Sequence, residues 1–222
     1  MSIVIPIDGP TSSGKSSVGF LFSKSIDFQY VDSGAIFRAG TMQILKQNIP
    51  LDNEEEVARV FAAAHIEFKE VNDRVHTFLN GEDISENLHS PEVTKAVPIV
   101  SAYKKVREAS TKLQREIASR ANTVMCGRDI GTEIFPVAKL KFYLTADIQV
   151  RAQRRWSQLR EKDPNISYEQ VLEDMIDRDK KDMIRKISPL RIAPDAVIIE
   201  NTVATSKESV EKMLSYYHQI YG

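Results

Sequence analysis

Short apolar runs alternate with stretches of helical spacing over most of the 222-residue chain. Five runs have the composition of buried strands: 3–7, 28–31, 123–126, 140–144 and 195–199. Helical spacing follows the first two runs and the last two. Strands that alternate with helices are typical of an α/β protein, so we expect a three-layer fold with a central parallel sheet flanked by helices.

Residues 51–99 follow a different pattern. A polar helix through 54–56 precedes two alternating runs, 66–68 and 75–79. Each run is followed by a pair of residues typical of hairpin turns, namely Asn72-Asp73 and Asn80-Gly81. We therefore expect a small antiparallel insert. No metal is predicted there, because its histidines are not as closely spaced as metal ligands are. These histidines are His65, His76 and His89.

Helical spacing resumes in three later stretches: 99–117, 148–162 and 206–221. Ser167 and Gln170 match a capping box that begins a further helix. Its expected inward residues are Tyr168, Val171, Leu172, Met175 and Ile176. A polar break at 163–165 separates this helix from the one before it, so the two are expected to form a helical hairpin that could move.

Composition restricts the function further. The hydrophobic content of 42% suffices for one α/β core, and the formal net charge of −1 gives no basic field to hold nucleic acid or an anionic membrane. The single cysteine, Cys126, excludes an internal disulfide framework. No apolar run approaches the ~18 residues of a membrane span, and no signal-peptide pattern precedes the first strand. We expect a soluble, cytoplasmic protein that binds small ligands.

The stretch from Gly9 to Ser17 fits the phosphate-loop pattern G-x-x-x-x-G-K-S, between the first strand and its helix. Its glycines let N–H groups turn toward phosphate oxygens. Lys15 is expected to reach the β- and γ-phosphates, and the Ser16 hydroxyl to bind Mg²⁺. Pro6 removes a ladder donor from the strand, so a local irregularity is expected there. The expected nucleotide-binding residues are Gly9, Thr11, Ser12, Ser13, Gly14, Lys15, Ser16 and Ser17.

Polar residues also follow the second and third expected strands. Asp32, Ser33 and Arg38 come after the second, and Arg128 and Asp129 lie between glycines after the third. In a doubly wound sheet this edge holds the ligand, so the first group is expected to face the same crevice as the phosphate loop. Taken alone, the first group does not outweigh an ordinary turn with a helix cap at Ser33 and a solvated arginine. The second group, taken alone, is about equally consistent with a surface turn held by its own ion pair.

Charged residues form two further groups on the hairpin helices. One face of the first helix carries Arg151, Arg154 and Arg155, and one stripe of the second carries Arg178, Asp182 and Arg185. Surface salt bridges are one interpretation, and each would contribute little. In a protein with a phosphate loop, the more economical interpretation is that these arginines hold several phosphates.

Together these motifs resemble the bacterial-type cytidylate kinases of the nucleoside monophosphate kinase group, almost from end to end. The matching pieces are the phosphate loop, D-S-G-A-I-F-R at 32–38, V-R-E at 106–108, G-R-D-I-G-T at 127–132, R-A-x-R-R at 151–155 and R-D-x-x-D-x-x-R at 178–185. The phosphate loop alone defines only a superfamily, whereas its combination with the last motifs and the strand-rich insert is specific. The resemblance implies transfer of the γ-phosphoryl group of ATP, with Mg²⁺, to CMP or dCMP.

The resemblance also implies roles for individual residues. The cytosine would be surrounded by Ser33, Arg107, Asp129 and Arg185. The acceptor phosphate would be held by Arg38 and Arg128, and the sugar and transferring phosphates would lie near Arg178 and Asp182. The expected catalytic residues are Lys15, Arg128, Arg151, Arg154, Arg155 and Arg178. We expect one kinase domain that acts as a monomer, with a core (1–59, 100–150 and 186–222), a nucleotide-binding insert (60–99) and a lid region (151–185).

The chain departs from the family pattern at Cys126, where an acidic residue is usual, and at Pro98, where a serine would meet the sugar. If Pro98 lies in the first turn of a helix that continues to Ile117, Ser101 lies one turn further on and is a candidate replacement. Two alternatives stay open: another small-molecule kinase with a phosphate loop, and a nucleotide-binding regulatory protein without transfer. The pyrimidine-matching pair of Arg107 and Asp129 argues against the first, and the retained arginines argue against the second.

Overall fold

The computed structural model describes residues 2–161 and 163–222, and the chain divides into two compact units. Unit 1 is mainly Tyr30–Ala121, and unit 2 comprises Ile3–Gln29 and Asn122–Gly222. The phosphate loop and the helical hairpin belong to unit 2, and the antiparallel insert belongs to unit 1. The expected division into core, insert and lid is a different partition and stays a prediction. Within the described residues, no helix is both long and apolar enough to cross a membrane.

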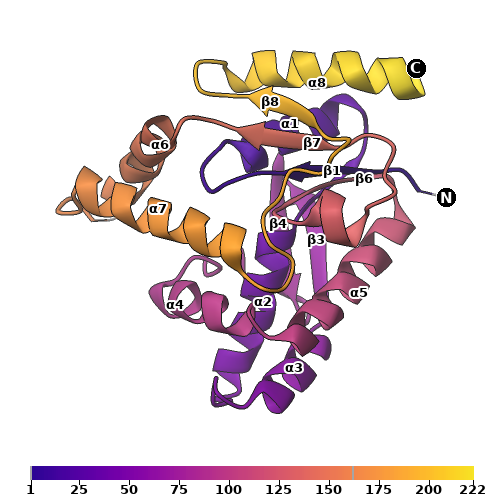
Figure 1. Ribbon diagram of the computed structural model, residues 1–222. Coiled ribbons are helices and arrows are strands. Elements are labelled where there is room, and N and C mark those ends of the chain that lie inside the picture. The colour runs from indigo at the N-terminus through magenta and orange to yellow at the C-terminus, as the bar shows by residue number, and fades with distance from the viewer. Residues whose placement is uncertain (1, 162) are drawn as a thin grey trace. The chain divides into compact units, whose positions relative to one another are not determined.

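A parallel sheet is the framework of unit 2 (Figure 1). β1 (Val4–Asp8) pairs in parallel with β6 (Thr123–Gly127) and β7 (Phe142–Thr145), and β7 pairs in parallel with β8 (Val197–Glu200). β2 (Gln29–Asp32), where the chain passes into unit 1, completes the order β2-β6-β1-β7-β8. The predicted α/β fold with a central parallel sheet and flanking helices is confirmed, and each expected strand is present within two residues of its expected bounds.

Pro6 does not interrupt β1, which pairs with β6 in unbroken register. The N–H of Thr123 donates to the carbonyl of Ile3 (2.8 Å). The odd-numbered residues of β1 therefore direct their backbone N–H and C=O groups toward β6. Pro6 therefore faces the β7 side, where pairing is with Ile7 and Asp8, beyond the proline. Its missing N–H costs no ladder bond, and the predicted irregularity is wrong for that reason.

Aromatic packing joins the sheet of unit 2 to two of its helices. α1 (Lys15–Ser25) follows the phosphate loop, and α8 (Ser206–Tyr221) packs against it, with the bounds expected for the terminal helix. The fully buried ring of Phe22 meets Phe142 of β7 and Tyr217 of α8 edge-on, with centroid separations of 5.6 and 6.2 Å. Such edge contacts stabilise beyond the area they bury, so they fix α1 firmly on the sheet.

The helices α6 (Ile148–Arg160) and α7 (Tyr168–Ile184) form the predicted hairpin, and the capping box of Ser167 and Gln170 is present. Trp156 of α6 donates its indole N–H to the carbonyl of Ile166 (3.0 Å), across the polar break. The buried centre of the hairpin comprises Ala152, Val171 and Met175, with Ile148, Trp156, Leu159, Ile166, Tyr168 and Leu172 packed around it. This apolar seam holds the two helices together.

Two expectations for the hairpin had different outcomes. Ile176 was expected to point inward but is 49% exposed. The buried stripe of α7 continues one turn on from Met175 to Asp179, and residue 176 lies about 100° around the helix from that stripe. Lys162, the expected end of the first helix, lies outside the described residues, and α6 is described to Arg160.

Unit 1 contains the predicted antiparallel insert. Its helices α2 (Ser33–Lys46) and α3 (Glu54–Ala62) precede a three-stranded sheet of β3 (Ile66–Val71), β4 (Arg74–Leu79) and β5 (Glu82–Asp83). The predicted turns have the positive φ angles that tight hairpin turns require: 50° and 57° at Asn72 and Asp73, and 52° and 86° at Asn80 and Gly81. The residue types at the two turns therefore predicted the hairpins of this insert correctly.

The expected helix from 99 to 117 is wrong, because two helices share that stretch. α4 (Pro91–Val100) ends before Ser101, and α5 (Lys104–Arg120) begins after Tyr103. Tyr103 has an extended backbone, and its hydroxyl donates to the carbonyl of Leu51 (2.7 Å), which anchors the break. Pro98 lies in the last turn of α4, and the Ser101 hydroxyl is 3.5 Å from its carbonyl. The helix geometry on which Ser101 was suggested as a sugar contact is therefore absent.

Candidate active site

The phosphate loop connects β1 to α1 through backbone that only certain residues adopt easily. Gly9 and Gly14 have φ of 151° and 99°, and Ser12 has φ of 58°. A Cβ atom at Gly9 would lie 2.0 Å from the carbonyl oxygen of Leu144, so only glycine fits there. α1 begins directly after Gly14, which has no side chain to cap the first turn. No side chain caps the N–H groups of this turn, and together with the positive end of α1 they are suited to hold an anion.

Lys15 is the cation of this loop. Its side chain is buried, and Nζ donates to the carbonyl of Pro10 (2.6 Å) and to the hydroxyl of Ser13 (3.4 Å). The ammonium group is therefore held against the loop itself. A phosphate bound at the start of α1 would lie within the field of this charge.

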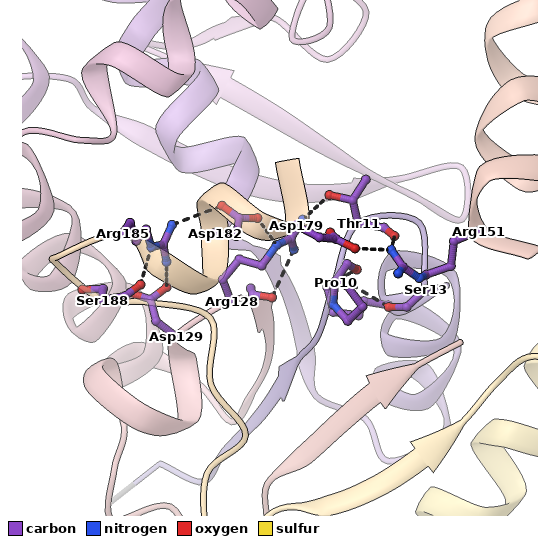
Figure 2. Close-up of polar contacts among 12 residues, drawn as sticks. Pro10, Thr11, Ser13, Arg128, Asp129, Arg151, Asp179, Asp182, Arg185 and Ser188 are labelled. Atoms are coloured by element: carbon purple, nitrogen blue, oxygen red, sulfur yellow. Dashed lines mark hydrogen bonds and ion pairs between the residues drawn. The ribbon is translucent and has the colours of Figure 1, made fainter. Parts of the chain in front are cut away.

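Two arginines of unit 2 reach Thr11 of the phosphate loop, and Figure 2 draws them on either side of it. Arg128, just after β6, donates to the Thr11 hydroxyl (2.8 Å) and pairs with Asp182 (3.0 Å). Arg151 of α6 donates to the Thr11 carbonyl (3.1 Å) and pairs with Asp179 (2.6 Å). Segments far apart in the sequence therefore bring two guanidinium groups to the loop that would hold phosphates.

Asp182 connects Arg128 to a second charged pair. Its other oxygen lies 3.6 Å from Arg185, and Arg185 lies 3.6 Å from Asp129 (Figure 2). Arg185 also donates to the carbonyl of Ser188. Four of the predicted substrate-binding residues, from the loop after β6 and the end of α7, thus form one continuous network. Asp129 is buried, so a ligand that reaches its carboxylate is largely removed from water.

Asp8, the last residue of β1, holds the segment that carries Arg128 and Asp129. Its carboxylate accepts from the backbone N–H groups of Ile130 (2.9 Å) and Gly131 (2.7 Å), at the start of the π-helical turn η1 (Ile130–Ile134). Burial raises the pKa of Asp8 to about 6, against the lowering effect of these two hydrogen bonds. The carboxyl group therefore titrates near neutral pH.

This titration predicts a specific pH dependence of stability. The folded pKa of Asp8 is raised above its unfolded value of 3.8, so its contribution is fully present below about pH 4 and is lost as the pH rises through about 6. The free energy of unfolding of the wild type, relative to Asp8→Asn, is expected to fall by about 3 kcal/mol between about pH 4 and pH 7. Urea unfolding of both proteins across this range measures the difference. A difference that does not vary with pH would contradict the assignment.

The remaining predicted residues of unit 2 do not all join the network. Arg154 donates to the carbonyl of Asn201 (2.7 Å), and Arg155 is half-buried, with its pKa lowered by desolvation. Arg178 is exposed on α7. Ser16 and Ser17 are exposed in the first turn of α1. The structure thus brings Arg151 to the loop and ties Arg154 to the end of β8, although the two share one helix.

Three predicted substrate residues belong to unit 1. Ser33 is the buried first residue of α2, whose N-terminus is capped by Asp32 through the N–H of Gly34 (2.8 Å). Arg38, on the same helix, lies 3.5 Å from the hydroxyl of Thr94. Arg107 of α5 is buried, with its guanidinium carbon 5.4 Å from the ring centroid of Phe37. Within unit 1, Arg107 is therefore close to the helix that carries Ser33 and Arg38.

Sequence reasoning missed three residues that hold this site together: Asp8, Asp179 and Asn201. Asp8 had one local signal, since a carboxylate directly before the first glycine of the loop is poorly placed for a phosphate and needs another partner. Asp179 stands within the motif R-D-x-x-D-x-x-R, but nothing in the spacing indicates its partner in α6. Asn201 donates to the carbonyl of Ser13 (2.8 Å) over a separation of 188 residues, which no local pattern predicts.

No group of histidine, cysteine or acidic residues that could hold a metal ion by itself occurs in the described part of the chain. Magnesium in phosphate-transferring enzymes is usually held by one or two protein oxygens together with substrate phosphates and water. The exposed hydroxyl of Ser16, beside Lys15, is an oxygen donor of that kind. The donor set therefore fits Mg²⁺ that arrives with a nucleotide.

A phosphate loop on the middle strand of a parallel sheet, with a buried lysine and two converging arginines, defines a nucleotide-dependent kinase of the P-loop class. Residues 5–219 match the family model described as cytidylate kinase. The chain belongs to the cytidylate kinase family, which confirms the resemblance inferred from the motifs, and it is an enzyme.

Individual relatives agree with this assignment. The cytidylate kinase of Caldanaerobacter subterraneus subsp. tengcongensis is 42% identical over 96% of this chain and 93% of its own length. The cytidylate kinase of Caldicellulosiruptor bescii is 37% identical, over 98% and 96% respectively. A shikimate kinase structure from Bacteroides thetaiotaomicron has a TM-score of 0.51 at 12% identity and covers 97% of this chain and 98% of its own, which supports the fold alone.

Proposed function

We propose that this chain transfers the γ-phosphoryl group of ATP to CMP or dCMP, giving ADP and CDP or dCDP, in pyrimidine nucleotide metabolism. The observation that carries the proposal is the convergence of Arg128 and Arg151 on the phosphate loop, in a member of the cytidylate kinase family. We further propose that it acts as a cytoplasmic monomer on these small molecules, without nucleic acid or membrane partners. The near-zero net charge supports this choice of ligands.

The donor phosphates would bind at the loop. Backbone N–H groups at the start of α1 would hold their oxygens, and Lys15 would exchange the carbonyl of Pro10 for a phosphate oxygen. Ser16 is the residue that would hold Mg²⁺, which neutralises phosphate charge when it is bound. Because the acceptor phosphate is already anionic, no general base is required of the protein.

The arginines would neutralise the charge that spreads over the transferring group. Arg128 would hold the acceptor phosphate with Arg38, and Arg178 and Asp182 would act near the sugar and the phosphates. Arg151, Arg154 and Arg155, on the lid, would complete this set of positive charges around the transferring group, which we call the clamp. Closure of the lid would also exclude water. Arg128 and Arg151 already carry carboxylate partners, so phosphate must compete with Asp182 and Asp179 for them. These carboxylates keep both guanidinium groups oriented before a nucleotide binds.

Base selection would rest on Ser33, Arg107, Asp129 and Arg185. Asp129 is buried and accepts hydrogen bonds only, so it matches the amino group of cytosine. Uracil would bring a carbonyl oxygen to the same carboxylate. An unsatisfied buried polar group costs about 1–3 kcal/mol, and a charged one costs more.

We therefore expect kcat/KM for UMP to be well over tenfold below that for CMP at neutral pH. A coupled assay that follows ADP with CMP, dCMP, UMP and AMP measures this ratio and tests the proposed function directly. Asp129→Asn is the matched variant. It should bring kcat/KM for UMP closer to that for CMP, because its amide can donate to the uracil carbonyl. Transfer to none of the four would favour a regulatory protein or a different acceptor, and equal use of UMP and CMP would contradict the role of Asp129.

A further inference from the structure

Asn201 connects three parts of unit 2 at the end of β8. Its side chain is buried, and its backbone N–H donates to Thr145 (2.8 Å) at the end of β7. The amide Nδ2 donates to the carbonyl of Ser13 in the phosphate loop (2.8 Å). The amide Oδ1 accepts from the hydroxyl of Ser209 in α8 (3.0 Å), and the backbone carbonyl accepts from Arg154 (2.7 Å). Every polar group of this residue therefore has a partner.

The orientation of the Asn201 amide follows from its partners. A backbone carbonyl can only accept, so the atom that faces Ser13 must be the NH₂ group. Ser209 can donate its hydroxyl to the remaining oxygen. An aspartate at this position would fit in size, but as a carboxylate it would present a second acceptor to the Ser13 carbonyl.

The bond to Ser13 fixes one peptide plane of the phosphate loop. In a trans peptide the C=O and N–H groups point in opposite directions, and the chain contains no cis peptide among the described residues. Because the Ser13 carbonyl points to Asn201, the N–H of Gly14 points away from Asn201. A Cβ atom at Gly14 would lie 2.5 Å from Asn201 Nδ2, so the amide also occupies the space on that side of the loop.

We propose that Asn201 is a positioning residue for ATP: it holds the Ser13–Gly14 peptide so that the Gly14 N–H is available to a nucleotide phosphate. Thr11 is held in a similar way, since its carbonyl accepts from Arg151. Two carbonyl groups of the loop are thus held by side chains from outside it, Arg151 of α6 and Asn201 at the end of β8. The proposal rests on the proposed function, because the phosphate concerned is that of ATP.

The test is Asn201→Asp, assayed against the wild type between pH 5.5 and 8.5 with ATP and CMP varied separately. At pH 8 the variant is expected to have a KM for ATP raised about tenfold, with a KM for CMP changed by less than about twofold. The ATP defect is expected to shrink as the pH falls, because a protonated carboxyl group can again donate to Ser13. A purely structural role would not produce a defect confined to ATP and reversed by acid.

Two control variants separate loss of the hydrogen bond to Ser13 from loss of the bond to Ser209 and from the effect of an added charge. Ser209→Ala keeps the bond from Asn201 to Ser13 and is expected to change the KM for ATP less than about twofold. Asn87→Asp adds the same charge at an exposed position of unit 1 and is expected to have no effect. If Asn201→Asp does not fold at pH 8, Asn201→Ala replaces it, with the same expected rise in the KM for ATP but no recovery in acid.

The outcomes also distinguish this proposal from the proposed function. A wild type that phosphorylates CMP, together with an Asn201→Asp variant whose KM for ATP is unchanged or whose defect does not vary with pH, would overturn the role of Asn201 alone. A wild type without transfer would overturn the proposed function. In that case the ATP-induced rise in Tm of the two proteins still measures whether Asn201 supports ATP binding, and equal rises would overturn its role.

Discussion

Replacing Lys15 with alanine is expected to lower kcat for CMP phosphorylation about 10²–10³-fold, as removal of a single preorganised donor does at other charged transition states. The ammonium group is buried and lies against the loop that would hold the phosphates, so little water is available to replace its charge. A coupled assay at saturating ATP and CMP measures the loss. Activity within a few-fold of the wild type would show that this loop does not bind the transferring phosphates.

The matched control for Lys15 is Lys24→Ala, at the exposed end of the same helix. It removes the same charge from α1 without reaching the loop, and it is expected to leave kcat unchanged. Thermal unfolding of both variants shows whether the fold is retained. Lys15 also donates to Pro10 and Ser13, so calorimetric titration with ATP is needed to separate weaker binding from slower transfer.

Replacing Arg151 with methionine is expected to lower both the stability and the activity. Arg151 and Asp179 are each 8% exposed, and their charged atoms are 2.6 Å apart. Removing one partner of a buried pair leaves an uncompensated charge, which costs about 3–5 kcal/mol. The second oxygen of Asp179 has no hydrogen-bond partner among the described residues, so the carboxylate would lose the bond from Arg151 while its other oxygen is already unsatisfied. Urea unfolding measures this loss.

The double variant Arg151→Met with Asp179→Leu separates the two roles. Replacing a whole buried ion pair with apolar groups is often neutral for stability, so the double variant is expected to recover most of the lost free energy of unfolding. Its kcat is expected to stay at least about tenfold below that of the wild type, because no cation then reaches Thr11 from α6. Recovery of activity together with stability would remove Arg151 from the proposed clamp.

Local chemistry explains what could be predicted from the sequence. The phosphate loop is contiguous, and its glycines are required by backbone geometry that the pattern itself encodes. The turns at Asn72-Asp73 and Asn80-Gly81 were predictable because few residues adopt positive φ. The strands were recognisable because buried parallel strands are nearly continuous apolar runs. In each case the deciding interaction lies within a few residues.

The errors and omissions share the opposite cause. The break between α4 and α5 depends on the hydroxyl of Tyr103 reaching Leu51, 52 residues away, while the apolar spacing continues through it. The pairs of Arg151 with Asp179 and of Asn201 with Ser13 depend on how helices and strand ends pack. Propensity and periodicity carry no information about such contacts. The grouping of Arg128, Asp129, Asp182 and Arg185 needed the structure for the same reason.

Trp156 is the only tryptophan of the chain, and it lies in the hairpin of α6 and α7. Its indole N–H is bonded to Ile166 across the polar break, and the guanidinium group of Arg160 lies 4.9 Å from its ring centroid. Indole emission shifts with the polarity and charge around the ring. Fluorescence excited at wavelengths that tryptophan absorbs and tyrosine does not therefore comes from this hairpin, so opening and closing of these two helices can be followed during turnover without any label.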